Sequence, residues 1–219
     1  MGYWALRSNT TGALNTAIGR STLRFNTTGY SNTAIGNSAL TSNTSGYENA
    51  ALGENALFSN TTGYYNTALG KGTLSTNQTG FSNTATGYRA LGYNSTGSSN
   101  SAFGYFTMIF NNTGGGNAAF GWQALYSNTS GNSNVAIGRD ALYKNTTRSN
   151  LVAIGDSALY NNGVGAVLPF HASHNSAIGS KALFSNTIGG SNTATGSLSL
   201  YTNTTGGCNT AMGYVSLYS

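Results

Sequence analysis

The sequence predicts an all-β protein, a parallel β-solenoid (β-roll) of about twelve 17-residue coils. We expect it to form a single domain over residues 1–219, with one expanded loop at 166–174. Two observations carry this prediction. A motif recurs with a fixed period along nearly the whole chain, and only 6% of the residues are charged, far below the roughly 25% of an ordinary domain. The chain has one Cys and one Pro, which excludes disulfide scaffolds and collagen.

The repeat can be written N-T-A-x-G-x-x-A-L-x-x-N-T-T-G-x-x. Each copy keeps the Ala at its third position and the Gly at its fifth, so nothing larger is expected to fit there. Two Gly and several Asn and Thr in every unit exclude a helical repeat, whereas short β-prone pieces separated by Asn-Thr-Thr-Gly turns, in which Gly or Asn supplies a positive φ, suit a solenoid. The copies begin at Asn15, Asn32, Asn49, Asn66, Asn83, Asn100, Asn117, Asn134, Leu151, Asn175, Asn192 and Asn209.

Stacking of the coils explains the composition. Residues 17 positions apart lie above one another, so Asn amides can hydrogen-bond along the axis and Leu side chains can interdigitate. Like charges would repel at this spacing, and two pairs of charged residues one period apart have opposite signs, Glu54 with Lys71 and Arg139 with Asp156. An inward column is predicted at Leu6, Leu23, Leu40, Leu57, Leu74, Leu91, Met108, Leu125, Leu142, Leu159, Leu183, Leu200 and Leu217.

The strand of each coil predicts a contact surface. Its Ala and Gly point to one side, and the residue between them points to the other. A thin coil has one interior, so this second, mostly apolar column favours self-association; the alternative is that the column lies inside and Ala and Gly form an outer strip. The column consists of Ile18, Ile35, Leu52, Leu69, Thr86, Phe103, Phe120, Ile137, Ile154, Ile178, Thr195 and Met212.

Residues 134–138 (Asn-Val-Ala-Ile-Gly) and 175–179 (Asn-Ser-Ala-Ile-Gly) resemble the repeated motif in YadA-like heads of trimeric autotransporter adhesins. The full unit resembles repeats in bacterial and phage tail-fibre-type proteins. The resemblance covers nearly the whole chain and implies a trimer of left-handed parallel β-rolls. It also implies a non-enzymatic protein displayed on a cell or virion surface, with a host-surface or glycan ligand. The 17-residue coils are longer than those typical of the adhesin heads.

Sequons of the form Asn-X-Ser/Thr occupy one column of the repeat, at the turn. N-glycosylation there would coat one edge of the protein with sugar, since a loop Asn is expected to be exposed. The alternative is that an Asn-Thr-Thr-Gly turn ladder generates sequons for structural reasons alone. The candidate acceptors are Asn9, Asn26, Asn43, Asn60, Asn77, Asn94, Asn111, Asn128, Asn145 and Asn203.

The expanded turn at 166–174 holds the only Pro and both His of the chain. Loops that leave a rigid repeat scaffold often carry recognition, so Pro169, Phe170, His171 and His174 are candidate recognition residues, against the alternative of a tolerated insertion. The two histidines could bind a metal only with further ligands, and no nearby acid or Cys supplies them, so neither a metal nor a cofactor is expected.

Aromatic residues fall in outward columns that either stack on sugars and neighbouring chains or cap the edge of the coil. One column follows the turn Gly and one follows the Leu. They consist of Tyr30, Tyr47, Tyr64 and Phe81, and of Phe58, Tyr126, Tyr143, Tyr160, Phe184, Tyr201 and Tyr218.

The titratable residues are few and scattered, so we expect no enzyme. The 9 Lys and Arg form no patch for nucleic acid, and no apolar stretch is long enough for membrane insertion. The favoured function is an extracellular or cell- or virion-surface structural fibre or adhesin rod. One alternative is a glycosylated fibril subunit that polymerises end to end, because Gly2 and Ser219 fall within coils and leave open β edges. Another is ice binding by an outward Thr row, which is interrupted at Ala50, Ala118, Val135 and Val152.

Overall fold

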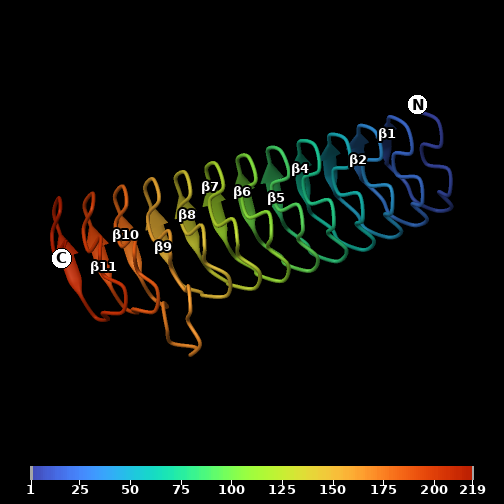
Figure 1. Cartoon of the computed structure of the whole chain (residues 1–219). Coiled ribbons are helices and arrows are strands. Elements are labelled where there is room, and N and C mark those ends of the chain that lie inside the picture. Colours follow the sequence, from blue (N-terminus) through green and yellow to red (C-terminus); the bar gives the residue numbers. More distant parts are fainter. Residues whose placement is uncertain (1, 219) are drawn as a thin grey trace. The chain divides into compact units, whose positions relative to one another are not determined.

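The computed structural model describes residues 2–218, which consist of short parallel strands joined by turns (Figure 1). The chain divides into two compact units, residues 1–113 and 114–219, and the single domain over 1–219 stays a prediction. Unit 1 holds β1 (Thr16–Ile18), β2 (Thr33–Ile35), β3 (Ala50–Leu52), β4 (Thr67–Leu69), β5 (Thr84–Thr86) and β6 (Ser101–Phe103). Unit 2 holds β7 (Ala118–Phe120), β8 (Val135–Ile137), β9 (Val152–Ile154), β10 (Ser176–Ile178), β11 (Thr193–Thr195) and β12 (Thr210–Met212). Residues 2–218 contain no helix long and apolar enough to cross a membrane.

Each unit is a parallel β-solenoid, as predicted. Strands pair in sequence order within a unit, in the 17-residue register that sets Ala17 beside Ala34. The register lengthens once, between β9 and β10. Two ion pairs confirm the predicted spacing: Lys71 Nζ lies 2.8 Å from Glu54 Oε2, and Arg139 Nε lies 2.8 Å from Asp156 Oδ1. Both pairs are largely exposed, so they mark the register and add little stability.

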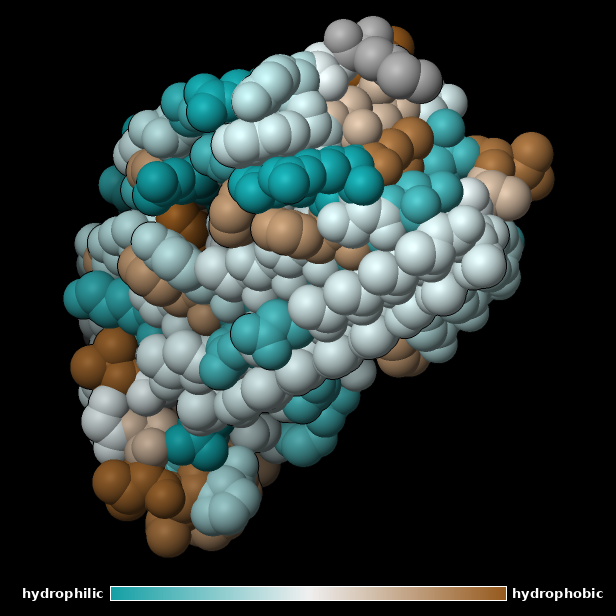
Figure 2. All heavy atoms as spheres, turned by 90° about the vertical axis from the view of Figure 1, so that its right-hand side faces the viewer, coloured by the Kyte–Doolittle hydropathy of each residue, from teal (hydrophilic) through white to brown (hydrophobic). Residues whose placement is uncertain are grey.

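The interior is thin and is filled by small and Leu side chains. The middle residue of each strand is a buried Ala, while Ile18 on the other side of the strand is 52% exposed. The alternative in which the Ile column lies inside is therefore wrong. The inward Leu column is confirmed from Leu23 to Leu200, with Met108, because these side chains are buried. At the two ends the prediction is wrong for Leu217, which is 56% exposed, and Leu6 is half-buried, because no further coil covers them in the described chain. Since like residues stack, bands of similar hydropathy cross the face shown in Figure 2.

The Leu column has a left-handed backbone. Leu23 and Leu57 have φ values of 50° and 51°, a conformation that costs a residue with a Cβ about 1–2 kcal/mol. Hydrogen bonds between coils accompany it: Leu23 N donates to Ala39 O at 3.1 Å, and Leu6 N donates to Thr22 O at 3.1 Å. These bonds and the burial of the Leu side chain offset the backbone cost.

The two glycines of the repeat have different roles. Gly36, at the end of β2, has a φ of 130°, and a Cβ there would lie 2.6 Å from Gly53 O, so nothing larger fits. The expectation that the turn glycine supplies a positive φ is wrong, because Gly29 does not have one. A Cβ on Gly29 would instead lie 2.4 Å from both Asn26 Oδ1 and Gly46 O. The turn glycine is required for close approach.

Two ladders of buried asparagines run through each unit. In the turn ladder, Asn43 Nδ2 donates to Asn26 Oδ1 at 2.7 Å and to Gly46 O at 2.9 Å. In the strand ladder, Asn49 Nδ2 donates to Asn32 Oδ1 at 3.1 Å and to Gly63 O at 2.9 Å. Both amide hydrogens are used in each case, which removes the penalty for burying the group. The predicted hydrogen bonding of Asn amides along the axis is confirmed.

Replacing Leu125 with Asp tests the core. Leu125 is fully buried, and we expect the unpaired carboxylate to cost more than the 2–5 kcal/mol typical of Leu→Ala and to unfold neighbouring coils. The measurement is thermal unfolding by circular dichroism. Thr146→Asp, at an exposed turn, is the control and should melt like the parent. An Leu125→Asp variant that also melted like the parent would show that the Leu column does not support the fold.

Replacing Asn77 with Asp tests the turn ladder. Asn77 Nδ2 donates to Asn60 Oδ1 at 2.8 Å and to Gly80 O at 3.0 Å, and Asp at this position would place a carboxylate against two acceptors. We expect a loss of at least about 3 kcal/mol at neutral pH. Burial raises the folded-state pKa of such a carboxyl, so the loss should shrink as the pH falls and the group becomes a neutral donor. Chemical denaturation across a pH series measures this, and a pH-independent loss would contradict it.

Candidate functional site

The inserted loop leaves unit 2 between β9 and β10, in the orange part of Figure 1. Asn162 Nδ2 donates to Ala172 O at 2.9 Å, which is the bond that other turn-ladder asparagines make to the turn glycine. Ala172 therefore occupies the turn-glycine position and is buried. Val164, Gly165 and residues 167–170 are exposed and Ala172 is buried, so the residues that leave the coil are 164–171, where the sequence predicted 166–174. His174 belongs to the regular coil.

Arg148 holds the loop in place. Its Nη2 donates to Ala166 O at 2.5 Å and its Nη1 donates to Leu168 O at 2.9 Å. Arg148 stands in the turn-glycine column, where a Cβ normally has no room: on Gly131 it would lie 2.3 Å from the backbone oxygen of the next coil. The loop opens the turn that follows Arg148, so the Gly-to-Arg change and the insertion belong together.

The loop forms one wall of a hollow. Its tip is apolar and exposed, with Val167 82% and Phe170 69% accessible. Gly190 and Gly207 line the hollow at positions where unit 1 carries the tyrosine column, so the missing side chains open it. The hollow has a volume of about 350 Å³ and is lined by Phe170, His171, Ile188, Gly190, Ser191, Thr205, Gly207 and Cys208.

The structure brings together some of the predicted recognition residues. Phe170 and His171 share the hollow, whereas Pro169 and His174 are not among its lining residues. Sequence reasoning missed Cys208, although the repeat places it in the column of His174, two periods on (208 − 174 = 34 = 2 × 17). Among residues 2–218 no group of three or more His, Cys, Asp or Glu side chains could hold a metal ion.

Eight of the ten sequon asparagines lack the exposure that was expected of a glycan acceptor, whereas Asn9 and Asn203 are half-buried. Asn26, Asn43, Asn60, Asn77, Asn94, Asn111, Asn128 and Asn145 are fully buried. A sugar on Nδ2 would replace a hydrogen that the ladder uses, for example in the bonds from Asn60 to Asn43 and Gly63. The structural alternative thus accounts for the sequons in the folded coil.

The strand face carries a row of exposed apolar side chains in each unit. In unit 1, Leu52 and Leu69 are 46% and 42% exposed; in unit 2, Ile137 and Ile178 are 40% and 44% exposed. A shallow apolar hollow of about 260 Å³ lies over β2, β3 and β4. Contiguous apolar patches of this kind mark interaction surfaces.

The aromatic columns form stacks. Ring centroids of Tyr30 and Tyr47 lie 4.9 Å apart, and those of Tyr126 and Tyr143 in unit 2 also lie 4.9 Å apart. Burial, then the neighbouring tyrosines, raises the pKa of Tyr143. Stacked rings cover each other's faces, so these columns offer mainly edges to a ligand, which favours the prediction that they cap the coil.

Comparison with protein-family models, with curated proteins and with solved structures finds no match to this chain.

Replacing Arg148 with Lys tests the loop clamp. Lys keeps the charge but lacks the planar fork that reaches two carbonyl oxygens. We expect protease cleavage within residues 164–171 to become about tenfold faster or more, because charge-assisted hydrogen bonds are lost, while the melting temperature stays near that of the parent. Limited proteolysis with mass spectrometry measures this. Arg139→Lys, at a surface ion pair, is the matched control, and equal cleavage of both variants would refute the clamp.

Proposed function

We propose that this chain is a non-enzymatic structural fibre or adhesin module, displayed outside the cell or on a cell or virion surface, that assembles with copies of itself through its strand face. The observation that carries the proposal is the exposed apolar row on the strands of both units. A second copy of the chain presents the same row, so the surface is self-complementary in chemistry.

The strand face has none of the features that keep a sheet surface from associating. The twelve strands contain no charged residue. Of their two outward positions, the last residue is Ile, Leu, Phe, Thr or Met and the first is Thr, Ser, Ala or Val. Soluble monomers rarely expose a contiguous apolar patch of this kind, and charged side chains would interrupt it. The absence of charge from these described strands therefore supports a covered face, and the resemblance to trimeric adhesin heads supports three copies.

The proposal of a non-enzyme rests on how the titratable groups lie. Asp140, Asp156 and Arg139 form a surface cluster in which Arg139 Nε is 2.8 Å from Asp156 Oδ1 and 3.8 Å from Asp140 Oδ2. Burial raises the pKa of Asp140, and Arg139 opposes this effect. Arg139 lies within ion-pair distance of both carboxylates, so the cluster is a surface ion-pair network and does not present the pair of free carboxylates that glycoside hydrolysis uses.

The double variant Leu52→Lys, Leu69→Lys tests the strand-face assembly. We expect the parent to be an oligomer, and the variant to fall to the monomer mass, because buried and unpaired ammonium groups would oppose packing. Light scattering after size-exclusion chromatography gives the mass, and circular dichroism checks the fold.

The control Thr28→Lys, Thr62→Lys adds the same charge at exposed turns and should keep the parent's mass. A monomeric parent would refute the proposal. An oligomer that survives in the strand-face variant would also refute it, and would favour end-to-end assembly.

A further inference from the structure

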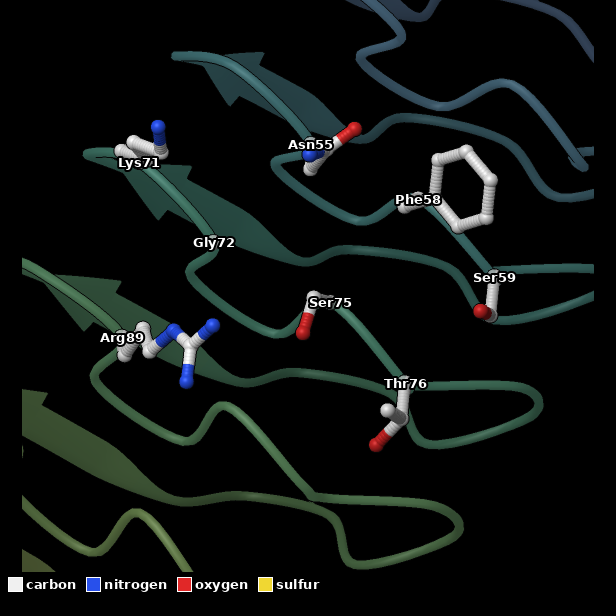
Figure 3. A pocket seen from close by; sticks show the side chains of 8 residues that line it. All are labelled: Asn55, Phe58, Ser59, Lys71, Gly72, Ser75, Thr76 and Arg89. Atoms are coloured by element: carbon white, nitrogen blue, oxygen red, sulfur yellow. The ribbon is translucent and has the colours of Figure 1, made fainter.

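A second hollow lies in unit 1, on the turns that follow β3, β4 and β5 (Figure 3). It has a volume of about 270 Å³. It differs from the strand-face hollow in being lined by cations, hydroxyls, an amide and an aromatic ring. The lining residues are Asn55, Phe58, Ser59, Lys71, Gly72, Ser75, Thr76 and Arg89.

Two interruptions in the columns open this hollow. Gly72 stands in the column of Asn55 and Arg89, and Ser75 stands in the column of Phe58. A Cβ on Gly72 would lie 3.2 Å from Arg89 Cγ, so the glycine lets the stem of Arg89 lie close to the backbone. In Figure 3 the Arg89 guanidinium extends toward Ser75, and the Phe58 ring lies on the other side of the hollow.

Some polar groups of this hollow make no hydrogen bond within the described chain. Arg89 is exposed and pairs with no carboxylate among residues 2–218; its guanidinium carbon lies 5.7 Å from the centre of the Tyr88 ring. The Asn55 amide and the Ser59 hydroxyl make no hydrogen bond to any other described group. Lys71 differs, because its ammonium is already bonded to Glu54 at 2.8 Å.

Ser75 and Thr76 can act only as acceptors toward a ligand. Ser75 Oγ donates to Gly92 O at 2.9 Å, and Thr76 Oγ1 shares its single hydrogen between Gly92 O at 3.2 Å and Asn94 O at 3.1 Å. Their oxygen lone pairs remain available. The hollow therefore offers hydrogen-bond donors at Arg89 and groups that both donate and accept at Asn55 and Ser59. The Ser75 and Thr76 oxygens are acceptors at its base.

Phe58 supplies an aromatic face that the ladders lack. The rings of the tyrosine columns cover each other, whereas Phe58 has Thr41 and Ser75 above and below it in its column and stacks on no ring in the described chain. It is 38% exposed. An open aromatic face beside hydrogen-bonding groups suits a ring that is apolar on its face and polar at its rim.

We propose that this hollow binds one acidic sugar residue of a glycan, with a carboxylate or sulfate on Arg89, the apolar face of the sugar ring on Phe58, and hydroxyls on Asn55 and Ser59. Guanidinium binds such anions through paired, charge-assisted hydrogen bonds. The volume is just below the roughly 300–1,000 Å³ of pockets for drug-sized ligands, which fits a single ring. A single unpaired cation is too little for a nucleic-acid backbone. The site does not depend on strand-face assembly.

The test is titration calorimetry of the full chain with three oligosaccharides of equal length, one neutral, one bearing uronate carboxylates and one bearing sulfates. We expect saturable binding of an acidic oligosaccharide and at least about tenfold weaker binding of the neutral one. Arg89→Gln should lower the affinity for the acidic sugar by a similar factor. Gln123 occupies the same column, so the coil accepts this side chain.

Gly72→Ser provides a second variant that should fold, because Ser38 holds the same column with a φ of 60°. Its Cβ would push against Arg89, and we expect weaker binding. Arg20→Gln is the matched control, since it removes the same charge from an exposed site in an earlier coil. The proposal is overturned if Arg20→Gln and Arg89→Gln weaken binding equally, which would indicate general charge attraction. It is also overturned if no oligosaccharide binds, or if inorganic sulfate or an acidic peptide competes as well as the sugar.

Discussion

The fold depends on the requirement that every buried asparagine amide be satisfied. In both ladders the Nδ2 group donates once along the axis and once to a glycine carbonyl, as Asn60 does toward Asn43 and Gly63. An amide left unpaired in this interior would cost about 1–3 kcal/mol, so one wrong residue affects the coils on both sides. This requirement favours a constant register of 17 residues, and where one coil is longer the extra residues leave as a loop, so that Asn186 Nδ2 still donates to Asn162 Oδ1 at 2.9 Å. It also fixes the turn glycine, since a Cβ there would collide with the Asn side chain that bonds its carbonyl.

The sequence was sufficient to predict the fold class, the register and the inward Leu column, because a period in the sequence becomes a column in space. Glu54 with Lys71 shows how far this reaches: the spacing alone predicted a contact that the structure gives at 2.8 Å. The burial of the sequon asparagines was not predicted. The motif describes a turn, and only the stacked structure shows that the amide at that turn points inward to its neighbours. The left-handed backbone at Leu23 is equally invisible, since Leu is among the residues least expected there.

The candidate sites were harder to predict because they arise where columns are interrupted. Phe170 and His171 were expected from the inserted loop, but the hollow beside them needs Gly190 and Gly207, which a search for chemically active residues passes over. The same is true of Gly72, whose missing side chain makes room for Arg89. In a repeat of this kind an absent side chain carries as much information as a present one. Both hollows lie where a column of the repeat carries Gly in place of a larger residue.

The ladders also explain why the insertion lies where it does. At the coil that contains Leu151 the strand ladder loses its Asn. Leu151 N still donates to Asn134 Oδ1 at 3.1 Å, as Asn49 N does to Asn32 Oδ1, but the side-chain bond along the axis is missing. In the turn ladder, Asn145 Oδ1 is buried without a hydrogen-bond partner in the part of the chain that the structure describes. Both ladders are thus interrupted within one coil, next to the loop. An insertion elsewhere would break an intact ladder, and the lost hydrogen bonds would add to the entropy cost of ordering the loop. Here the loop lies where the ladders are already interrupted. Arg148 then holds the loop through hydrogen bonds in the opened turn. The coil in which both ladders are interrupted is therefore the one that displays the loop side chains.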